Sequence, residues 1–348
     1  ILSVIALTLF GLFMIYDASS YVAFRDFGDK YQYVKNQFLW VFLGAISLFI
    51  VSFFDYHKLY NLALPILIGS IFLLFLVFIP GLGIRALGAS RWIDFGFFVI
   101  QPSEFVKLAL TIYLSAWFST KEKGRFIAFL LLIGLVILLV MLQPDMGTAM
   151  IILGEAIILY FLSGGSALHI FSLIPAVGLG GLALILLEPY RAARLATFLN
   201  PEKEILGSSY HLRQILIALG SGGLFGVGIG NSLQKYAYLP EATTDSIFAI
   251  IAEELGFVGV TILLLVMLFI IYRGFYIAIR AKDNFGKLLA GGISSVLAIQ
   301  IIVNLGAQTA LLPLTGVPLP FISYGGSALI VNLFSVGILL NISRQSHA

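Results

Sequence analysis

Residues 243–272 read TTDSIFAIIAEELGFVGVTILLLVMLFIIY, which joins the end of a long polar interval to a long apolar run. An apolar run of roughly 17–25 residues can cross the hydrocarbon core of a membrane as a helix. The whole chain has a matching composition, because 60% of its 348 residues are hydrophobic and only 11% are charged, against roughly a quarter charged in soluble domains. The sequence therefore predicts an integral membrane protein.

Working outward from this run, the chain contains about ten apolar segments of spanning length. They cover residues 1–16, 36–53, 59–79, 103–118, 126–142, 146–163, 166–187, 246–272, 286–311 and 322–342. We predict an all-α polytopic membrane protein that forms one domain over residues 1–348. The chain opens without a charged leader or a small-residue cleavage site, so we expect a membrane span there rather than a signal peptide. A long polar loop, residues 188–245, separates the seventh and eighth segments, and loops of this length usually carry function.

The distribution of lysine and arginine predicts the orientation, because cytoplasmic loops are enriched in them. With the N-terminus inside, the inner loops hold nine such residues: Lys58, Lys121, Lys123, Arg125, Arg273, Arg280, Lys282, Lys287 and Arg344. The outer loops then hold five: Arg25, Lys30, Lys35, Arg85 and Arg91. We therefore expect both termini in the cytoplasm. The loops at 80–102, 143–145, 188–245 and 312–321 would share the extracytoplasmic face, which we expect to be the functional one.

Charged residues within the predicted spans are candidate functional positions, because each costs about 2.5–3.5 kcal/mol at a helix centre on insertion scales. Glu104 and Lys107 lie three residues apart, so on a helix they either pair or contact a substrate. Asp145 is expected either to cap the following helix or to serve the function directly. Glu155 lies in mid-span without a partner nearby in the sequence.

Glu253 and Glu254 fall about two turns into the eighth segment. Adjacent residues of a helix point about 100° apart. We therefore expect at most one of these two carboxylates to face a cavity.

Three features of the extracytoplasmic loops suggest anion binding, and each has a structural alternative. Arg191 and Arg194 share a helical spacing and could bind phosphate or lipid headgroups. The glycine-rich residues 220–230 follow no strand, so they predict tight turns beside the membrane rather than a nucleotide site. Residues 323–327, SYGGS, could form an amide nest for an anion or a flexible entry to the last span.

Other chemistries find little support in the composition. The chain has no cysteine and four scattered histidines, which argues against disulfides, Cys-ligated metals and a histidine metal cage. Its net charge of +3 is small and forms no basic block, which argues against nucleic-acid binding.

Ordered motifs along nearly the whole chain resemble the SEDS family (shape, elongation, division and sporulation), the polytopic peptidoglycan polymerases typified by RodA and FtsW. The motifs are GASRWID (88–94), QPSE (101–104) with Lys107, QPDMGT (143–148), EPYR (188–191), LGSGG (219–223), LPE (239–241) with Thr244 and Asp245, EELG (253–256) and PFISYGGS (320–327). Residues 231–242 are closer to the division-type FtsW branch than to the elongation-type RodA branch.

The resemblance implies polymerisation of lipid II into glycan strands, with Asp245 as the catalytic base. A carboxylate can take the proton of a sugar hydroxyl as it attacks the anomeric carbon of a donor with an undecaprenyl pyrophosphate leaving group. The alternative role of Asp245 is to cap the eighth helix. The expected substrate-binding residues are Arg91, Trp92, Glu104, Lys107, Asp145, Arg191, Arg194, Gln234, Lys235, Glu241, Ser323 and Tyr324.

The chain departs from the family pattern at three positions. Members usually carry histidine where this chain has Thr243, and phenylalanine where it has Ser246. If that histidine relays a proton, this chain must manage the step otherwise. Glu155 matches no family motif.

The resemblance also implies a partner and leaves a cofactor open. SEDS polymerases work with a class B penicillin-binding protein, whose helix is expected near the eighth and ninth spans. Small residues around Gly291 and Ser295 could form the docking face or pack the chain's own helices. A divalent cation, Mg²⁺ or Mn²⁺, could bridge the substrate phosphates. The rival functions are a lipid II flippase and a non-enzymatic scaffold for division proteins.

Overall fold

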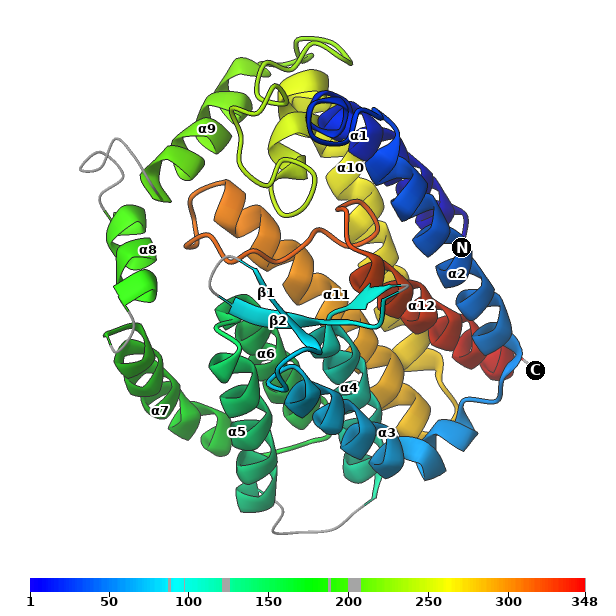
Figure 1. Cartoon of the computed structure of the whole chain (residues 1–348). Helices are drawn as coiled ribbons and strands as arrows, with labels where there is room; N and C mark the ends of the chain where they lie inside the picture. Colours follow the sequence, from blue (N-terminus) through cyan, green and yellow to red (C-terminus); the bar gives the residue numbers. More distant parts are fainter. Residues whose placement is uncertain (87–88, 97, 121–125, 187–188, 200–207, 348) are drawn as a thin grey trace. The chain divides into compact units, whose positions relative to one another are not determined.

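The computed structural model describes residues 1–86, 89–96, 98–120, 126–186, 189–199 and 208–347 (Figure 1). A helix occupies each apolar segment predicted from the sequence. These helices are α1 (Leu2–Phe27), α2 (Gln32–Phe53), α3 (His57–Leu76), α4 (Pro102–Ser119), α5 (Phe126–Leu142), α6 (Met146–Leu162), α7 (Ala167–Leu186), α10 (Ile247–Arg280), α11 (Asn284–Gln308) and α12 (Gly326–His347).

Six of the helices in the described residues are long and apolar enough to cross a membrane, namely α1, α2, α3, α10, α11 and α12. Helices α5 and α6 are apolar but shorter. The predicted class, a mainly helical polytopic membrane protein, is therefore confirmed. That all the apolar segments cross the membrane stays a prediction.

The interval predicted as a long loop contains two helices, α8 (Pro189–Leu199) and α9 (Ser208–Ser221). Pro189 stands at the first position of α8, where its missing N–H costs no hydrogen bond and its fixed φ suits a helix. Glu188 and the basic turn at 121–125, both used in the sequence analysis, lie outside the described residues.

The chain forms two compact units, each assembled from segments distant in sequence. The first unit comprises residues 1–39, 170–270 and 300–325. The second comprises residues 40–169, 271–299 and 326–348. The single domain expected for residues 1–348 stays a prediction.

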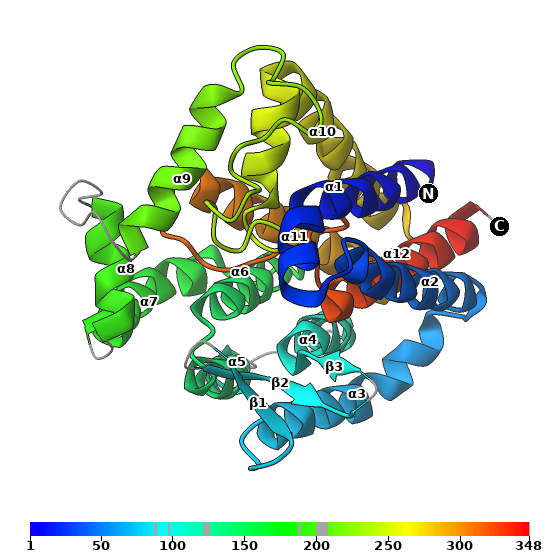
Figure 2. The same ribbon diagram turned by 45° about the horizontal axis from the view of Figure 1, so that its top comes forward.

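In the second unit, α4 packs against α3, α6 and α12. Its buried face includes Val106, Leu110 and Leu114, which recur at helical spacing. A small antiparallel sheet lies beside these helices (Figure 2). It consists of β1 (Gly83–Ala86), β2 (Ala89–Asp94) and β3 (Val99–Ile100) in the order β1-β2-β3. The sequence predicts only a loop at 80–102, because strands this short show too few alternating residues to be recognised.

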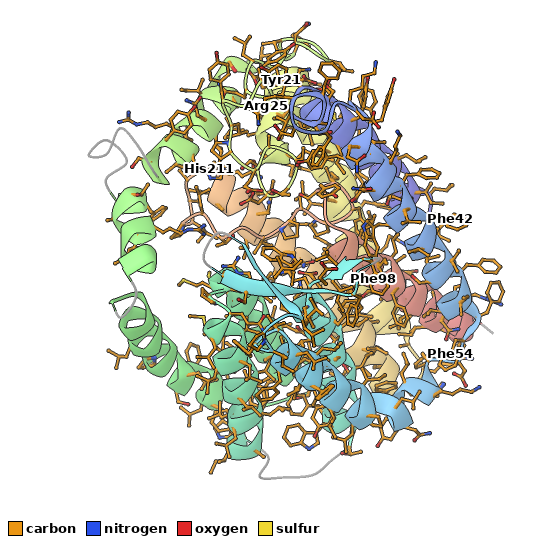
Figure 3. The ribbon with its side chains drawn as sticks, in the orientation of Figure 1. Tyr21, Arg25, Phe42, Phe54, Phe98 and His211 are labelled. Carbon is orange, nitrogen blue, oxygen red and sulfur yellow. The ribbon has the colours of Figure 1, made fainter. Side chains whose placement is uncertain are left out.

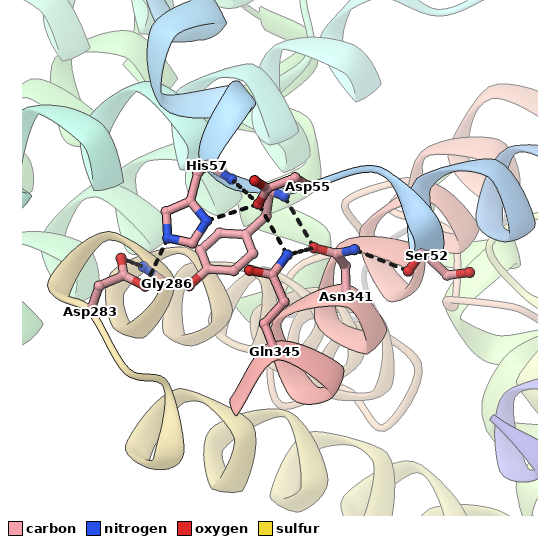
Figure 4. Close-up of polar contacts among 8 residues, drawn as sticks. Ser52, Asp55, His57, Asp283, Gly286, Asn341 and Gln345 are labelled. Atoms are coloured by element: carbon pink, nitrogen blue, oxygen red, sulfur yellow. Dashed lines mark hydrogen bonds and ion pairs between the residues drawn. The ribbon is translucent and has the colours of Figure 1, made fainter. Parts of the chain in front are cut away.

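A polar network ties the turn between α2 and α3 to the end of α12 within the second unit (Figure 4). The Tyr56 amide donates to Asn341 Oδ1 (3.0 Å), and Gln345 Nε2 donates to Asp55 Oδ1 (3.0 Å). Hydrogen bonds from Gln345 and His57 lower the pKa of Asp55 to about 2. This carboxylate therefore remains ionised throughout the physiological range and serves the turn.

In the first unit, α10 is interrupted at Gly256, whose φ is 64° and ψ −169°. The glycine-rich segment supplies the hydrogen bonds that the interruption leaves open, since Val227 N donates to Glu253 O (3.0 Å) and Phe257 N donates to Gly223 O (2.9 Å). A Cβ added at Gly226 would lie 2.0 Å from the Glu254 carbonyl oxygen. The predicted tight turning at 220–230 is confirmed, and it covers the backbone groups of a broken membrane helix.

Candidate functional site

Asp245 lies at the end of the polar interval, two residues before α10 begins at Ile247. Its side chain is half-buried. Thr244 Oγ1 lies 3.2 Å from Asp245 Oδ1 and 2.8 Å from Glu241 Oε2, and its single proton can serve one of them at a time. Burial, followed by the neighbouring Glu241 carboxylate, raises the pKa of Asp245 to about 6, while hydrogen bonds from its own amide and from Thr244, and then the charge of Arg194, oppose this shift. A carboxylate with this pKa is ionised at neutral pH yet basic enough to accept a proton.

Two side-chain amides of α11 hold the backbone at Asp245. Asn304 Nδ2 and Gln308 Nε2 both donate to the Asp245 carbonyl oxygen, over 2.9 and 2.6 Å. Gln308 Oε1 also accepts from the Ala249 amide (2.9 Å), so Gln308 caps the first turn of α10. The capping role predicted as the alternative for Asp245 thus belongs to Gln308, and neither amide is among the predicted site residues. The available signal was a series of three amides, each one turn from the next, at Gln300, Asn304 and Gln308 in a mostly apolar segment.

The loop between α11 and α12 passes beside Asp245. Gly316 has a φ of +73°, and a Cβ added to it would lie 3.9 Å from Asp245 Oδ2. The Tyr324 amide donates to the Thr243 carbonyl (2.8 Å), so Tyr324 is brought to this site. The Ser323 hydroxyl accepts from the Leu319 amide (2.8 Å). This hydroxyl therefore stabilises the turn before α12.

Helix α8 carries both arginines of the predicted phosphate site, Arg191 and Arg194. The predicted helical spacing is therefore confirmed. The Arg194 guanidinium donates to the Leu314 carbonyl, which connects α8 to the same loop that passes Asp245. Arg194 thus contributes positive charge to the surroundings of this carboxylate.

His211, a residue of α9 (Figure 3), contacts the residue next to Asp245. Its Nε2 lies 2.7 Å from Ser246 Oγ, and Ser246 directly follows Asp245. Burial, followed by the charge of Arg194, lowers the pKa of His211 to about 4. At neutral pH, His211 is therefore an uncharged hydrogen-bonding group. His211 is not among the predicted site residues, because it lies 35 positions before Ser246 and no local pattern connects the two.

Lys235 belongs to a buried cluster of charges in the first unit. Its Nζ lies 2.9 Å from Asp17 Oδ1 and 3.2 Å from Glu254 Oε1. The Ser232 amide also donates to Glu254 (3.1 Å), while the Ser232 hydroxyl donates to Glu253. Both glutamates thus anchor the same loop, and the prediction that at most one of them faces a cavity stays a prediction. The substrate role predicted for Lys235 stays a prediction.

Gln234 precedes this lysine and is buried, with 7% of its surface exposed. Its Oε1 has no hydrogen-bond partner among the described residues. The substrate role predicted for it is not tested by this geometry.

In the second unit, Glu104 and Lys107 form an ion pair of 2.8 Å with 2% of each side chain exposed. The pairing alternative is therefore confirmed. The Thr111 hydroxyl, one turn further along α4, contacts Glu155 of α6. This is the partner that the sequence could not supply for Glu155.

Asp145 caps α6, since its Oδ1 accepts from the Thr148 amide (3.1 Å), as the capping alternative predicted. Its Oδ2 accepts from Gln101 Nε2 (3.3 Å). Arg91 of β2 donates to the Gln143 carbonyl (3.1 Å) and to the Pro144 carbonyl. Trp92, the next residue of β2, pairs with Ile84 of β1. The unpredicted sheet thus positions two of the predicted site residues.

The predicted site residues fall into groups that lie within one unit or the other. Asp245, Glu241, Arg194 and Tyr324 belong to the first unit, and Arg91, Glu104, Lys107 and Asp145 belong to the second. In the part of the chain that the structure describes, no group of three or more His, Cys, Asp or Glu residues could hold a metal ion.

Comparison with known proteins relates this chain to cell-wall synthesis. The FtsW/RodA/SpoVE family model, described as "Cell cycle protein", matches residues 1–348. Stage V sporulation protein E of Bacillus subtilis is 42% identical over 353 residues, covering 99% of this chain and 96% of that protein. The probable peptidoglycan glycosyltransferase FtsW of Geobacter metallireducens is 40% identical over 351 residues, covering 99% of this chain and 94% of that protein.

Two solved structures share the fold. One comes from work titled "Structural coordination of polymerization and crosslinking by a peptidoglycan synthase complex", with a TM-score of 0.79 and 28% identity over 99% of this chain and 97% of that one. The other is the rod shape determining protein RodA of Thermus thermophilus, with a TM-score of 0.74 and 28% identity over 100% of this chain and 96% of that one.

Proposed function

Because this chain belongs to the FtsW/RodA/SpoVE family, we propose that it is a peptidoglycan glycosyltransferase that polymerises lipid II into glycan strands. It would act at the outer face of the bacterial cytoplasmic membrane, as a multi-pass protein with both termini in the cytoplasm. The observation that carries the mechanism is the placement of Asp245. Its backbone is fixed by side chains of α11, and its half-buried carboxylate has a pKa near 6.

In the proposed reaction, the ionised Asp245 carboxylate takes the proton of the acceptor's sugar hydroxyl. The hydroxyl oxygen attacks the anomeric carbon of the donor, and the bond to undecaprenyl pyrophosphate breaks with inversion. Stabilisation of the leaving pyrophosphate requires positive charge more than a general acid. Asp245 finally returns its proton to solvent, which completes the cycle.

The positive charge would come from arginines and lysines of the site. Arg194 and Arg191 of α8 are the candidates in the first unit, because guanidinium groups bind phosphate oxygens in a bidentate manner. The substrate roles predicted for Arg91 and Lys107 of the second unit stay predictions, and Lys107 is paired with Glu104. Each of these cations would contribute by attracting phosphate more strongly as charge develops on the leaving group.

A divalent cation could share this charge. The carboxylate of Glu241, which accepts from Thr244 (2.8 Å), offers oxygen ligands of the kind that Mg²⁺ takes together with substrate phosphates. When bound, the ion would neutralise the pyrophosphate. We propose that a chelator lowers polymerisation and that added Mg²⁺ or Mn²⁺ restores it, and chelator-insensitive synthesis would remove the ion from the mechanism.

A class B penicillin-binding protein is the proposed partner, at the eighth and ninth spans, now α10 and α11. The small residues of α11 pack against the chain's own helices, because a Cβ at Gly291 would lie 3.0 Å from Leu162 Cδ1 and Ser295 is buried and donates to the Gly291 carbonyl (2.7 Å). The packing alternative therefore explains this stripe, and we place the partner on the exposed apolar face of α10 instead. This face includes Phe257, Ile262, Leu265, Leu268 and Phe269.

Alanine substitutions at Ile262, Leu265 and Phe269 together should reduce co-purification with the transpeptidase. Matched alanine substitutions at Phe72 and Phe75, exposed apolar residues of α3, should not. Equal co-purification of both variants would place the partner elsewhere.

Reconstitution of the purified chain with fluorescent lipid II, with and without the transpeptidase, tests the function itself. Glycan chains of increasing length are the expected product. Movement of lipid II across the bilayer without chain growth would favour the flippase. Neither activity in the presence of the transpeptidase would favour the scaffold.

A further inference from the structure

We infer that Asn304 and Gln308 are positioning residues that fix Asp245 and leave its carboxylate free of helix capping. This inference rests on the proposed role of Asp245 as the base. The two amides lie one turn apart near the end of α11, and each has 2% of its surface exposed.

The hydrogen bonds of these two side chains form a closed set. Asn304 Nδ2 donates to the carbonyls of Asp245 (2.9 Å) and Val317 (2.8 Å). Gln308 Nε2 donates to the Asp245 carbonyl (2.6 Å) and to Asn304 Oδ1 (2.9 Å). Each NH₂ group has two hydrogens, and each hydrogen has an acceptor. A flipped amide would place oxygen against oxygen, so the network defines one arrangement of both side chains.

The network also decides what the Asp245 carboxylate does. The first turn of a helix has unpaired N–H groups, and a polar side chain just before the helix usually accepts one of them. Asp245, two residues before Ile247, would reach them by turning toward the helix. Here Gln308 Oε1 accepts from the Ala249 amide (2.9 Å). The carboxylate instead lies beside Gly316 and contacts the Thr244 hydroxyl (3.2 Å) and its own backbone amide. A carboxylate that accepts backbone N–H groups becomes a weaker base, so the amide of Gln308 preserves the basicity of Asp245.

Val317 extends the network to the loop between α11 and α12. Asn304 holds the carbonyls of Val317 and Asp245 with one NH₂ group. Gly316, the neighbour of Val317, is the residue beside the carboxylate. Asn304 therefore sets the distance between the backbone of Asp245 and the loop that lies beside its carboxylate.

The pH dependence of kcat separates this role from a merely structural one. The charged groups around Asp245 are Glu241, which precedes it in the loop, and Arg194 of α8, while His211 of α9 is neutral. Gln308→Met removes the side-chain acceptor of the Ala249 amide, which keeps only its contact with the Ser246 carbonyl (3.0 Å), and the Asp245 carboxylate can turn toward this amide. The acidic limb is the part of the kcat–pH profile in which activity falls as the base becomes protonated. In this variant we expect the limb to move down by about one pH unit. We also expect kcat to be at least about tenfold lower and KM to stay within about twofold of the parent value.

Gln308→Glu should move the acidic limb in the opposite direction. The new carboxylate still accepts from Ala249, but it loses the Nε2 donor to the Asp245 carbonyl and adds a negative charge beside Asp245, which disfavours ionisation of the base. Gln300→Met is the matched control, because Gln300 is a buried glutamine of the same helix whose Oε1 has no partner among the described residues. Its kcat and its acidic limb should equal those of the parent chain.

Melting temperatures identify variants that fail to fold. If Gln308→Met does not fold, Gln308→Glu is the variant to measure, because its side chain keeps an oxygen that can accept from the Ala249 amide. Acidic limbs that stay at the parent position in the folded variants would overturn the inference. Asp245→Asn separates the two hypotheses. Full activity of Asp245→Asn would refute the proposed base, whereas an inactive Asp245→Asn with unmoved limbs at Gln308 would refute only the positioning role.

Discussion

Asp245 and Glu254 are carboxylates of one segment, nine residues apart, and they are held in opposite ways. Asp245 is fixed through its backbone carbonyl by Asn304 and Gln308, and its side chain contacts a neutral hydroxyl. Glu254 is fixed through its side chain, which pairs with Lys235 at 3.2 Å and accepts from the Ser232 amide. The first arrangement leaves a carboxylate available to a substrate. The second uses a carboxylate to fasten a loop.

The same distinction applies to the second unit. Glu104 is paired with Lys107 at 2.8 Å, and Asp145 is engaged as a helix cap. A base must release and accept protons, and an ion pair or a cap stabilises the charged form and so weakens it. Among the carboxylates compared, Asp245 therefore has the environment that base catalysis requires.

The largest effect should follow from removing Asp245. We expect Asp245→Ala to fold and insert but to abolish polymerisation, a loss of at least about a hundredfold, because a positioned base contributes about 10²–10⁴ in rate. Asp245→Glu should also be badly impaired, since one added methylene displaces the carboxylate by about 1 Å. Glycan synthesis by purified variants in vesicles measures both.

Asp26→Ala serves as the control, because Asp26 is an exposed carboxylate of the first unit. It should polymerise lipid II at the parent rate. Near-normal synthesis by Asp245→Ala would contradict the catalytic role that distinguishes Asp245 from Glu254.

Breaking the pair at Glu254 should act on stability instead. Lys235→Met leaves Glu254 and Asp17 buried without their shared cation, and removing one partner of a buried pair costs about 3–5 kcal/mol. We expect a lower melting temperature and a lower folded yield. The double variant Lys235→Met with Glu254→Gln should recover part of that loss.

Lys35→Met is the matched control, because Lys35 forms an exposed ion pair with Asp29, and such pairs contribute little. The measurement also tests the predicted substrate role of Lys235. An unchanged melting temperature combined with weakened lipid II binding would assign Lys235 to the pyrophosphate rather than to the fold.

The contrast between these residues explains which features the sequence could predict. The apolar segments, the Asp145 cap and the Glu104–Lys107 pair depend on residues a few positions apart, so local spacing was sufficient. The hydrogen bonds from Asn304 and Gln308 to the Asp245 carbonyl join residues 59 and 63 positions apart, and no local pattern encodes these contacts. The resemblance to the family's motifs identified Asp245 itself. Asn304 and Gln308, which fix its backbone, are recognised only in the folded structure.

The pH profile gives an intermediate effect. Because the pKa of Asp245 is raised to about 6, the ionised form predominates above this pH and is lost below it. Polymerisation should therefore be constant near neutrality and fall about tenfold per pH unit below pH 6. An acidic limb near pH 4, the range of an ordinary carboxylate, would mean that the environment of Asp245 does not tune it.

The smallest effect should come from the two arginines of α8. The positive charge of Arg194 opposes the raised pKa of Asp245, so removing it tests one part of the environment of this carboxylate. Replacing both Arg191 and Arg194 with glutamine should weaken the apparent affinity for lipid II about fivefold, equivalent to about 1 kcal/mol, because the half-buried Arg194 remains partly screened by water.

Arg194 also donates to the Leu314 carbonyl, so its removal could loosen the loop beside Asp245. Arg194→Lys keeps the charge but loses the planar donor, and it should retain affinity if charge alone matters. Removal of Arg194 should also raise the acidic limb of Asp245 slightly, since Arg194 favours its ionised form. Unchanged affinity in the double variant, with the limb unmoved, would leave the two arginines with only the headgroup-anchoring role. The pyrophosphate charge would then have to be met by the remaining candidate cations.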